Sequence, residues 1–111
     1  MNVYDVRRAV LFWTAALDYV VRDGDVDERF TVLVPREGPG VGVSLQASTS
    51  VPRDVPHVHL DLYTDDQAGE VERLLGLGAQ RVDWPDYPDD ADFVVLADPE
   101  GNRFCVIDTT R

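Results

Sequence analysis

The chain has 111 residues, of which 21 are acidic and 10 are basic, and its formal net charge at pH 7 is −11. So acidic a chain, without a run of Lys and Arg, argues against nucleic acid and disfavours anionic membrane surfaces as partners. The length predicts a single domain over residues 1–111. A lone cysteine, Cys105, excludes an intrachain disulfide and fits a reducing compartment, so we expect a cytoplasmic protein.

The first half of the sequence predicts one helix followed by two strands. Apolar residues recur at three- and four-residue spacing over residues 5–21, and Asp5 is a suitable N-cap. Alternating patterns predict strands over residues 30–34 and 41–47. Residues 48–56 contain two prolines and are expected to link this half to the next.

The second half predicts a strand, a helix and three further strands. Residues 57–63 alternate cleanly, with His59 and Asp61 on one face. The spacing of Thr64 and Gln67 predicts a capping box that opens the helix. A strand is expected over residues 80–84, and the final hairpin over residues 93–108.

The first half contains a segment with the same layout as this hairpin and its turn. In Asp98-Pro-Glu-Gly-Asn102, proline presets φ, and Gly101 or Asn102 can adopt the left-handed conformation. Phe30 and Gly38 have the same spacing as Phe93 and Gly101, 63 residues later. This repetition predicts an α+β fold of two βαβββ modules, about residues 1–50 and 57–111. The first module lacks most of its opening strand.

Several motifs in this order resemble the vicinal oxygen chelate superfamily, which includes glyoxalase I, bleomycin-resistance proteins and extradiol dioxygenases. They are Phe12-Trp13…Ala16-Leu17, His57-Val-His-Leu-Asp61, Leu77-Gly-Ala79 and Asp98-Pro-Glu-Gly-Asn102. The ending Gly101-Asn-Arg-Phe-Cys-Val106 is similar to the small glyoxalase-like branch. The resemblance implies two mixed sheets that curl around a cavity.

The resemblance also implies a divalent ion held by the first and last strands of both modules. In module two, the first-strand position falls on His59 and the last-strand position on Cys105. In module one, the last-strand position falls near Gln46 or Ser44. The first-strand position of module one falls ahead of Met1, so only an upstream start would supply that residue. The donors suit Mg²⁺ poorly and leave Zn²⁺ short of a third protein ligand, which Asp61 could provide. We therefore expect no resident cofactor. The alternative is Zn, Ni, Fe or Mn at His59 and Cys105.

Several candidate residues have two interpretations. His59 either contacts a ligand or bonds to a neighbouring side chain, whereas His57 is expected to be solvated. Cys105 is either a reactive or metal-binding thiol or, as we favour, an inert buried residue. Trp84 and Tyr87 either clamp a planar ligand or pack under their acidic loop.

These observations predict a small-molecule-binding protein of the glyoxalase/bleomycin-resistance type. Its cavity would hold an apolar, aromatic or cationic molecule among Gln46, His59, Asp61, Trp84 and Cys105. The alternatives are a metal-dependent glyoxalase-like lyase or isomerase, and a module used only for assembly. Catalytic residues are not identified, and whether the protein is an enzyme stays open. The missing strand leaves a sheet edge, which we expect a homodimer to cover.

Overall fold

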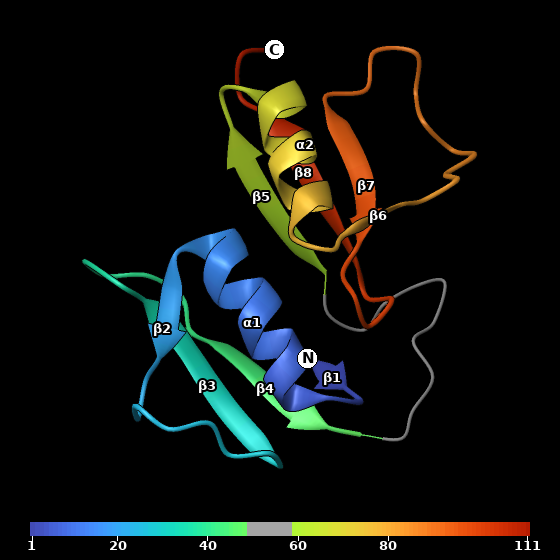
Figure 1. Ribbon diagram of the computed structural model, residues 1–111. Helices are drawn as coiled ribbons and strands as arrows, with labels where there is room; N and C mark the ends of the chain where they lie inside the picture. Colours follow the sequence, from blue (N-terminus) through green and yellow to red (C-terminus); the bar gives the residue numbers. More distant parts are fainter. Residues whose placement is uncertain (49–58) are drawn as a thin grey trace. The chain divides into compact units, whose positions relative to one another are not determined.

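The computed structural model describes residues 1–48 and 59–111 (Figure 1). The chain divides into two compact units, Met1–Pro52 and Arg53–Arg111. Residues 49–58, which include His57 and most of the predicted linker, lie outside the described part. No helix within residues 1–48 or 59–111 is long and apolar enough to cross a membrane.

The first unit is one helix on a four-stranded sheet in the order β1-β4-β3-β2. Strand β1 runs parallel to β4, and the other pairs are antiparallel. The elements are β1 (Asn2–Val3), α1 (Val6–Leu17), β2 (Tyr19–Val21), β3 (Phe30–Pro35) and β4 (Val43–Ala47).

The second unit repeats this arrangement in the order β5-β8-β7-β6, with β5 parallel to β8. The predicted α+β class with two βαβββ modules is therefore confirmed, and the opening strand of module one is only two residues long. The elements are β5 (Leu60–Thr64), α2 (Gln67–Gly76), β6 (Gln80–Arg81), β7 (Phe93–Ala97) and β8 (Arg103–Asp108).

Helix α1 begins as predicted but ends earlier. Asp5 is the N-cap, and its Oδ1 accepts a hydrogen bond from the backbone N–H of Arg8 at 3.1 Å. The helix stops at Leu17 because Asp18 adopts a left-handed conformation, with φ 55° and ψ 50°. The prediction of helix to residue 21 was wrong over Tyr19–Val21, which form β2. Two adjacent β-branched valines suit a strand, and pairing with β3 supplies the hydrogen bonds.

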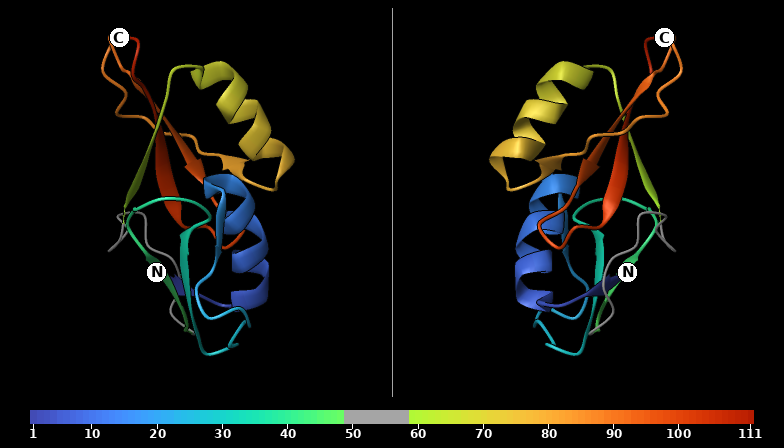
Figure 2. Two further views of the ribbon diagram at one scale, coloured as in Figure 1. Left: turned by 90° about the vertical axis from the view of Figure 1, so that its left-hand side faces the viewer. Right: turned by 90° about the vertical axis from the view of Figure 1, so that its right-hand side faces the viewer.

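Each helix covers one face of its own sheet (Figure 2). In the first unit, Trp13 of α1 and Leu33 and Leu45 of the sheet are completely buried. Side chains alternate along a strand, so Ser44 and Gln46, on either side of Leu45, lie on the face away from α1. This alternation leaves one face of the sheet uncovered by α1.

Helix α2 does not begin with the predicted capping box. Asp66 is the N-cap, and its carboxylate accepts from the backbone N–H of Gly69 at 3.2 Å. Thr64 accepts from the N–H of Asp66 instead. The side-chain amide of Gln67 donates to the carbonyl of Val106 at 3.0 Å, so it ties the helix to β8 rather than closing a box.

The strand predicted over residues 80–84 is shorter in the structure. Only Gln80–Arg81 pairs with β7. Further along β7, the backbone N–H of Val95 donates to the hydroxyl of Tyr87 at 2.7 Å. The ring of Tyr87 packs on Phe93, with centroids 5.3 Å apart. The acidic loop therefore covers the part of the β7 edge that β6 does not reach.

The β7–β8 turn forms as predicted, with Gly101 in the left-handed conformation at φ 86°. The N–H of Gly101 donates to the carbonyl of Asp98 at 2.9 Å. Asp98 is only 1% exposed, and its Oδ1 accepts from the backbone N–H groups of Glu100 and Asn102 at 2.9 and 2.8 Å. One buried carboxylate therefore satisfies two backbone donors of the turn.

Replacing Asp98 by alanine should lower the free energy of unfolding by about 2–4 kcal/mol, because two backbone donors lose a charged acceptor. Asp98→Asn keeps an oxygen acceptor and should lose less. Urea denaturation followed by circular dichroism measures both. Asp86→Ala, in the exposed acidic loop, is the control. Equal stability of Asp98→Ala and wild type would contradict this account of the turn.

Candidate functional site

Three potential ligand groups meet on the second sheet. Parallel pairing of β5 with β8 places Asp61 opposite Cys105. His59 lies two residues before Asp61, and its Nε2 is 3.1 Å from Asp61 Oδ1 and 3.2 Å from Cys105 Sγ. One donor atom from each residue lies within 4.8 Å of the other two. We call these three residues the His–Asp–Cys cluster.

The cluster lies on the sheet face away from α2. Phe104 and Val106, the neighbours of Cys105 on β8, are completely buried, and Gln67 of α2 bonds to the Val106 carbonyl. Alternation along β8 therefore directs Cys105 to the opposite face. The His59 and Asp61 side chains are 43% and 45% exposed, whereas Cys105 is 7% exposed. The cluster has a buried thiol beneath a solvent-accessible imidazole and carboxylate.

Burial raises the pKa of the Cys105 thiol to about 11, and the nearby Asp61 carboxylate adds to this effect. Both causes disfavour the thiolate, so the thiol is protonated at neutral pH. The same imidazole nitrogen faces both the carboxylate and the sulfur. A catalytic triad instead uses one ring nitrogen for the carboxylate and the other for the nucleophile. The geometry does not support Cys105 as an activated nucleophile.

Alkylation of Cys105 by iodoacetamide should be slow at pH 8 and should accelerate up to about pH 11. A pKa of about 11 instead of 9.0 reduces the thiolate fraction about 100-fold at this pH. The rate can be followed by intact mass spectrometry in the presence of EDTA. The same protein unfolded in urea is the reference, because Cys105 is the only cysteine. Equal rates for folded and unfolded protein would contradict the raised pKa.

Trp84 reaches the same sheet face through a contact that the sequence did not indicate. The guanidinium carbon of Arg103 lies 5.7 Å from the centre of a Trp84 ring, a cation–π distance. Arg103 precedes Cys105 by two residues on β8, so both side chains lie on one face. Tyr87 instead packs on Phe93, which agrees with the packing interpretation of this residue rather than with a ligand clamp.

Gln46 belongs to the other compact unit and is not part of the cluster. It is exposed on β4, where it pairs with Asn2 and Phe30. Val32 pairs with Ser44 as Val95 pairs with Cys105. When Phe30 is aligned with Phe93, Val32 is aligned with Val95. The residue of module one that corresponds to Cys105 is therefore Ser44. Both histidines of the chain belong to the second half, so module one has no matching imidazole.

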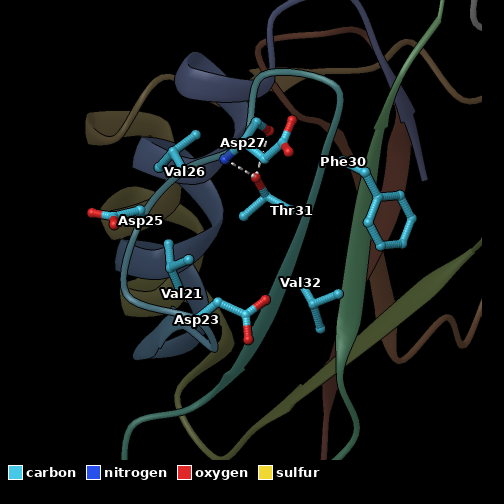
Figure 3. A pocket seen from close by; sticks show the side chains of 8 residues that line it. All are labelled: Val21, Asp23, Asp25, Val26, Asp27, Phe30, Thr31 and Val32. Carbon is cyan, nitrogen blue, oxygen red and sulfur yellow. Dashed lines mark hydrogen bonds between the residues drawn. The ribbon is translucent and has the colours of Figure 1, made fainter.

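A groove of about 670 Å³ lies in the first unit (Figure 3). The backbone N–H of Asp27 donates to Thr31 Oγ1 at 3.0 Å, and this hydroxyl donates to the Asp27 carbonyl at 2.7 Å. No sequence motif indicated the groove, because loop and strand residues without a shared periodicity form it. The residues that line the groove are Val21, Asp23, Asp25, Val26, Asp27, Phe30, Thr31 and Val32. None of the five predicted cavity residues is among them.

The His–Asp–Cys cluster fits some metal ions better than others. It offers one imidazole nitrogen, one carboxylate oxygen and one sulfur. Zinc and similar borderline ions accept all three donor types. Magnesium and calcium require oxygen ligands, of which this cluster has only the Asp61 carboxylate. The donor set is therefore compatible with a thiophilic divalent ion.

Paired βαβββ modules are the architecture that the resemblance to the vicinal oxygen chelate superfamily implied. Residues 1–107 match the family model of the glyoxalase-like domain, and the chain belongs to this family. The resemblance found in the sequence motifs is thereby confirmed. A comparison with curated proteins finds no match.

Solved structures of this superfamily share the fold at low sequence identity. A glyoxalase/bleomycin resistance protein/dioxygenase family enzyme from Burkholderia phytofirmans PsJN has a TM-score of 0.70 at 16% identity, covering 97% of this chain and 93% of its own. A fosfomycin resistance protein from Mesorhizobium loti has a TM-score of 0.68 at 16% identity, with coverages of 96% and 85%. A bleomycin-binding protein in complex with bleomycin has a TM-score of 0.65 at 15% identity, with coverages of 98% and 93%.

Proposed function

We propose that the protein binds a small molecule on the face of the second sheet that α2 does not cover. The observation that carries this proposal is the convergence of His59, Asp61 and Cys105 on that face. Binding sites combine apolar surface with a few well-placed polar groups. Here Val95 and Cys105 pair as a buried apolar floor, and His59 and Asp61 form its polar border.

The residues at this face favour an aromatic or cationic molecule. The Asp61 carboxylate is accessible, and the net charge of −11 attracts cations over a longer range. The indole of Trp84 lies beside β8 with the Arg103 guanidinium over one of its rings, and a planar ligand could extend this stack. A structurally similar protein was solved with bleomycin bound, which supports sequestration of a small molecule as the function.

Tryptophan fluorescence should report binding of such a molecule. Trp13 is completely buried in the core, whereas Trp84 is half-buried beside the proposed site. Titration with bleomycin and a panel of aromatic cations, in EDTA, should give a saturable change in emission that Trp84→Phe abolishes. Isothermal titration calorimetry then measures the affinity independently of the fluorophore.

Two aspartate variants separate a specific contact from general attraction. Asp61→Ala should weaken binding about tenfold, the usual effect of losing one charge-assisted hydrogen bond. Asp65→Ala removes an exposed carboxylate just after β5 and should leave the affinity within twofold of wild type. Equal losses in both variants, or saturable binding without any change at Trp84, would contradict the proposed site.

A metal-dependent lyase or isomerase is the second candidate function. The observation that favours it is the mixed nitrogen, oxygen and sulfur set of the cluster. A metal bound there would polarise an oxygen of the substrate. Turnover of a small-molecule substrate only after metal loading would favour the enzyme over a protein that sequesters its ligand.

Homodimerisation is also part of the proposal. Strand β1 pairs with β4 only at Gln46 and Ala47. The Met1 ammonium donates to the Ser44 carbonyl at 2.8 Å, and toward its start β4 has no further strand partner on this side among the described residues. Unpaired edges are commonly covered by a second chain. Light scattering after gel filtration should give twice the chain mass of 12.4 kDa, and a monomer at 100 µM would contradict the dimer.

A further inference from the structure

The groove of the first unit combines apolar walls with acidic side chains. It lies at the connection between β2 and β3, and its volume of about 670 Å³ is within the range of about 300–1,000 Å³ typical of small-molecule sites. Within the described part of the chain, no basic side chain lines it. The apolar lining residues are Val21, Val26, Phe30 and Val32, and the acidic ones are Asp23, Asp25 and Asp27.

Hydrogen bonds hold both ends of the β2–β3 connection in place. The backbone N–H of Gly24 donates to the Val21 carbonyl at 3.2 Å, and Gly24 turns the chain with φ 86°. Thr31, which is 3% exposed, closes the other end through its two hydrogen bonds with Asp27. The backbone N–H of Arg29 donates to Asp27 Oδ1 at 2.8 Å. The groove is therefore bounded by hydrogen-bonded turns and is formed before any ligand arrives.

The carboxylates of the groove are accessible to solvent and only weakly neutralised. Asp23 Oδ1 lies 3.3 Å from Arg22 Nε, and Asp27 Oδ1 lies 3.6 Å from Arg29 Nε. All four side chains are more than half exposed, and such ion pairs are weak. Asp25 forms no ion pair within the described part of the chain. The connection as a whole contains four acidic and two basic side chains, so it attracts cations.

Apolar side chains lie next to these carboxylates. In Figure 3, Val21 and Val26 belong to the loop side of the groove, Phe30 and Val32 belong to β3, and the Asp23 carboxylate points toward Val32. The Phe30 side chain is 49% exposed, so its ring is accessible. The face of an aromatic ring attracts a cation, and the valines offer surface to a hydrocarbon group.

We infer that this groove binds an organic ammonium ion that carries an apolar substituent. The ammonium group would bind at the carboxylates, and the substituent would pack against the valines and Phe30. A bare metal ion would leave the apolar half of the lining unused, so charge and apolar surface together favour the organic cation. The groove belongs to the first unit and shares no residue with the His–Asp–Cys cluster, so this site lies beyond the proposed function.

Titration of the full chain with 2-phenylethylammonium chloride, in EDTA, tests the site. Two-dimensional ¹H–¹⁵N NMR spectra should show saturable shifts of backbone amides within residues 21–32. The alcohol 2-phenylethanol has nearly the same size without the charge, and it should bind at least tenfold more weakly because it loses the charge-assisted hydrogen bond. The anion 3-phenylpropanoate should cause no saturable shift.

Variants identify the contacts. Asp23→Asn should weaken binding of 2-phenylethylammonium about tenfold. Phe30→Leu keeps an apolar side chain but removes the ring, and it should weaken binding about threefold, the effect of one exposed cation–π contact. Asp86→Asn makes the same charge change in the acidic loop of the second unit and should stay within twofold of wild type. The NMR spectrum of each variant also shows whether it is folded.

The contrary outcomes are equally definite. Shifts confined to amides around His59 and Trp84 would assign the cation to the second sheet alone and overturn the groove site. Saturation of residues 21–32 by calcium chloride, without any response to 2-phenylethylammonium, would make the connection an ion site and overturn it too. Equal losses in Asp23→Asn and Asp86→Asn would indicate general attraction only. Because the two sites involve different amides, failure of the groove is distinguishable from failure of the proposed function.

Discussion

Parallel pairing between β5 and β8 is the constraint on which the candidate site depends. Its register puts Asp61 beside Cys105 and brings the preceding His59 over the sulfur. Side chains on a strand alternate between faces, so a slip of one residue would turn Asp61 toward α2 and disperse the cluster. Burial of Phe104 and Val106 under α2 stabilises the observed register and therefore also positions the polar groups on the other face.

The two modules share strand order and direction, yet they differ in chemistry. The position of Cys105 in module two corresponds to Ser44 in module one, and Asn2 corresponds by register to Tyr63 rather than to His59. Packing under the helix constrains one face of each sheet, whereas the other face carries different side chains in the two modules. The cluster therefore belongs to one copy of a repeated unit, although both copies have the same fold.

The His–Asp–Cys cluster connects the two candidate functions, small-molecule binding and metal-dependent catalysis. Without a metal, burial keeps the Cys105 thiol protonated, and the imidazole and carboxylate are the accessible polar groups. A thiophilic ion would displace that proton, because the thiolate is the form that binds metal. The same three side chains would then anchor either a polar ligand directly or an ion that binds it.

The sequence by itself determined features that depend on neighbouring residues: the Asp5 cap, the Gly101 turn and the repetition that indicates two modules and their family. The family resemblance also identified His59 and Cys105 as candidates, and strand alternation added Asp61 on the face of His59. Tertiary structure alone decided where α1 ends, since β3 pairs with Tyr19–Val21, and where the Gln67 amide bonds. It also decided that His59 meets Cys105, 46 residues away, and that Trp84 meets Arg103. These contacts depend on strand register and loop path, which local patterns do not encode.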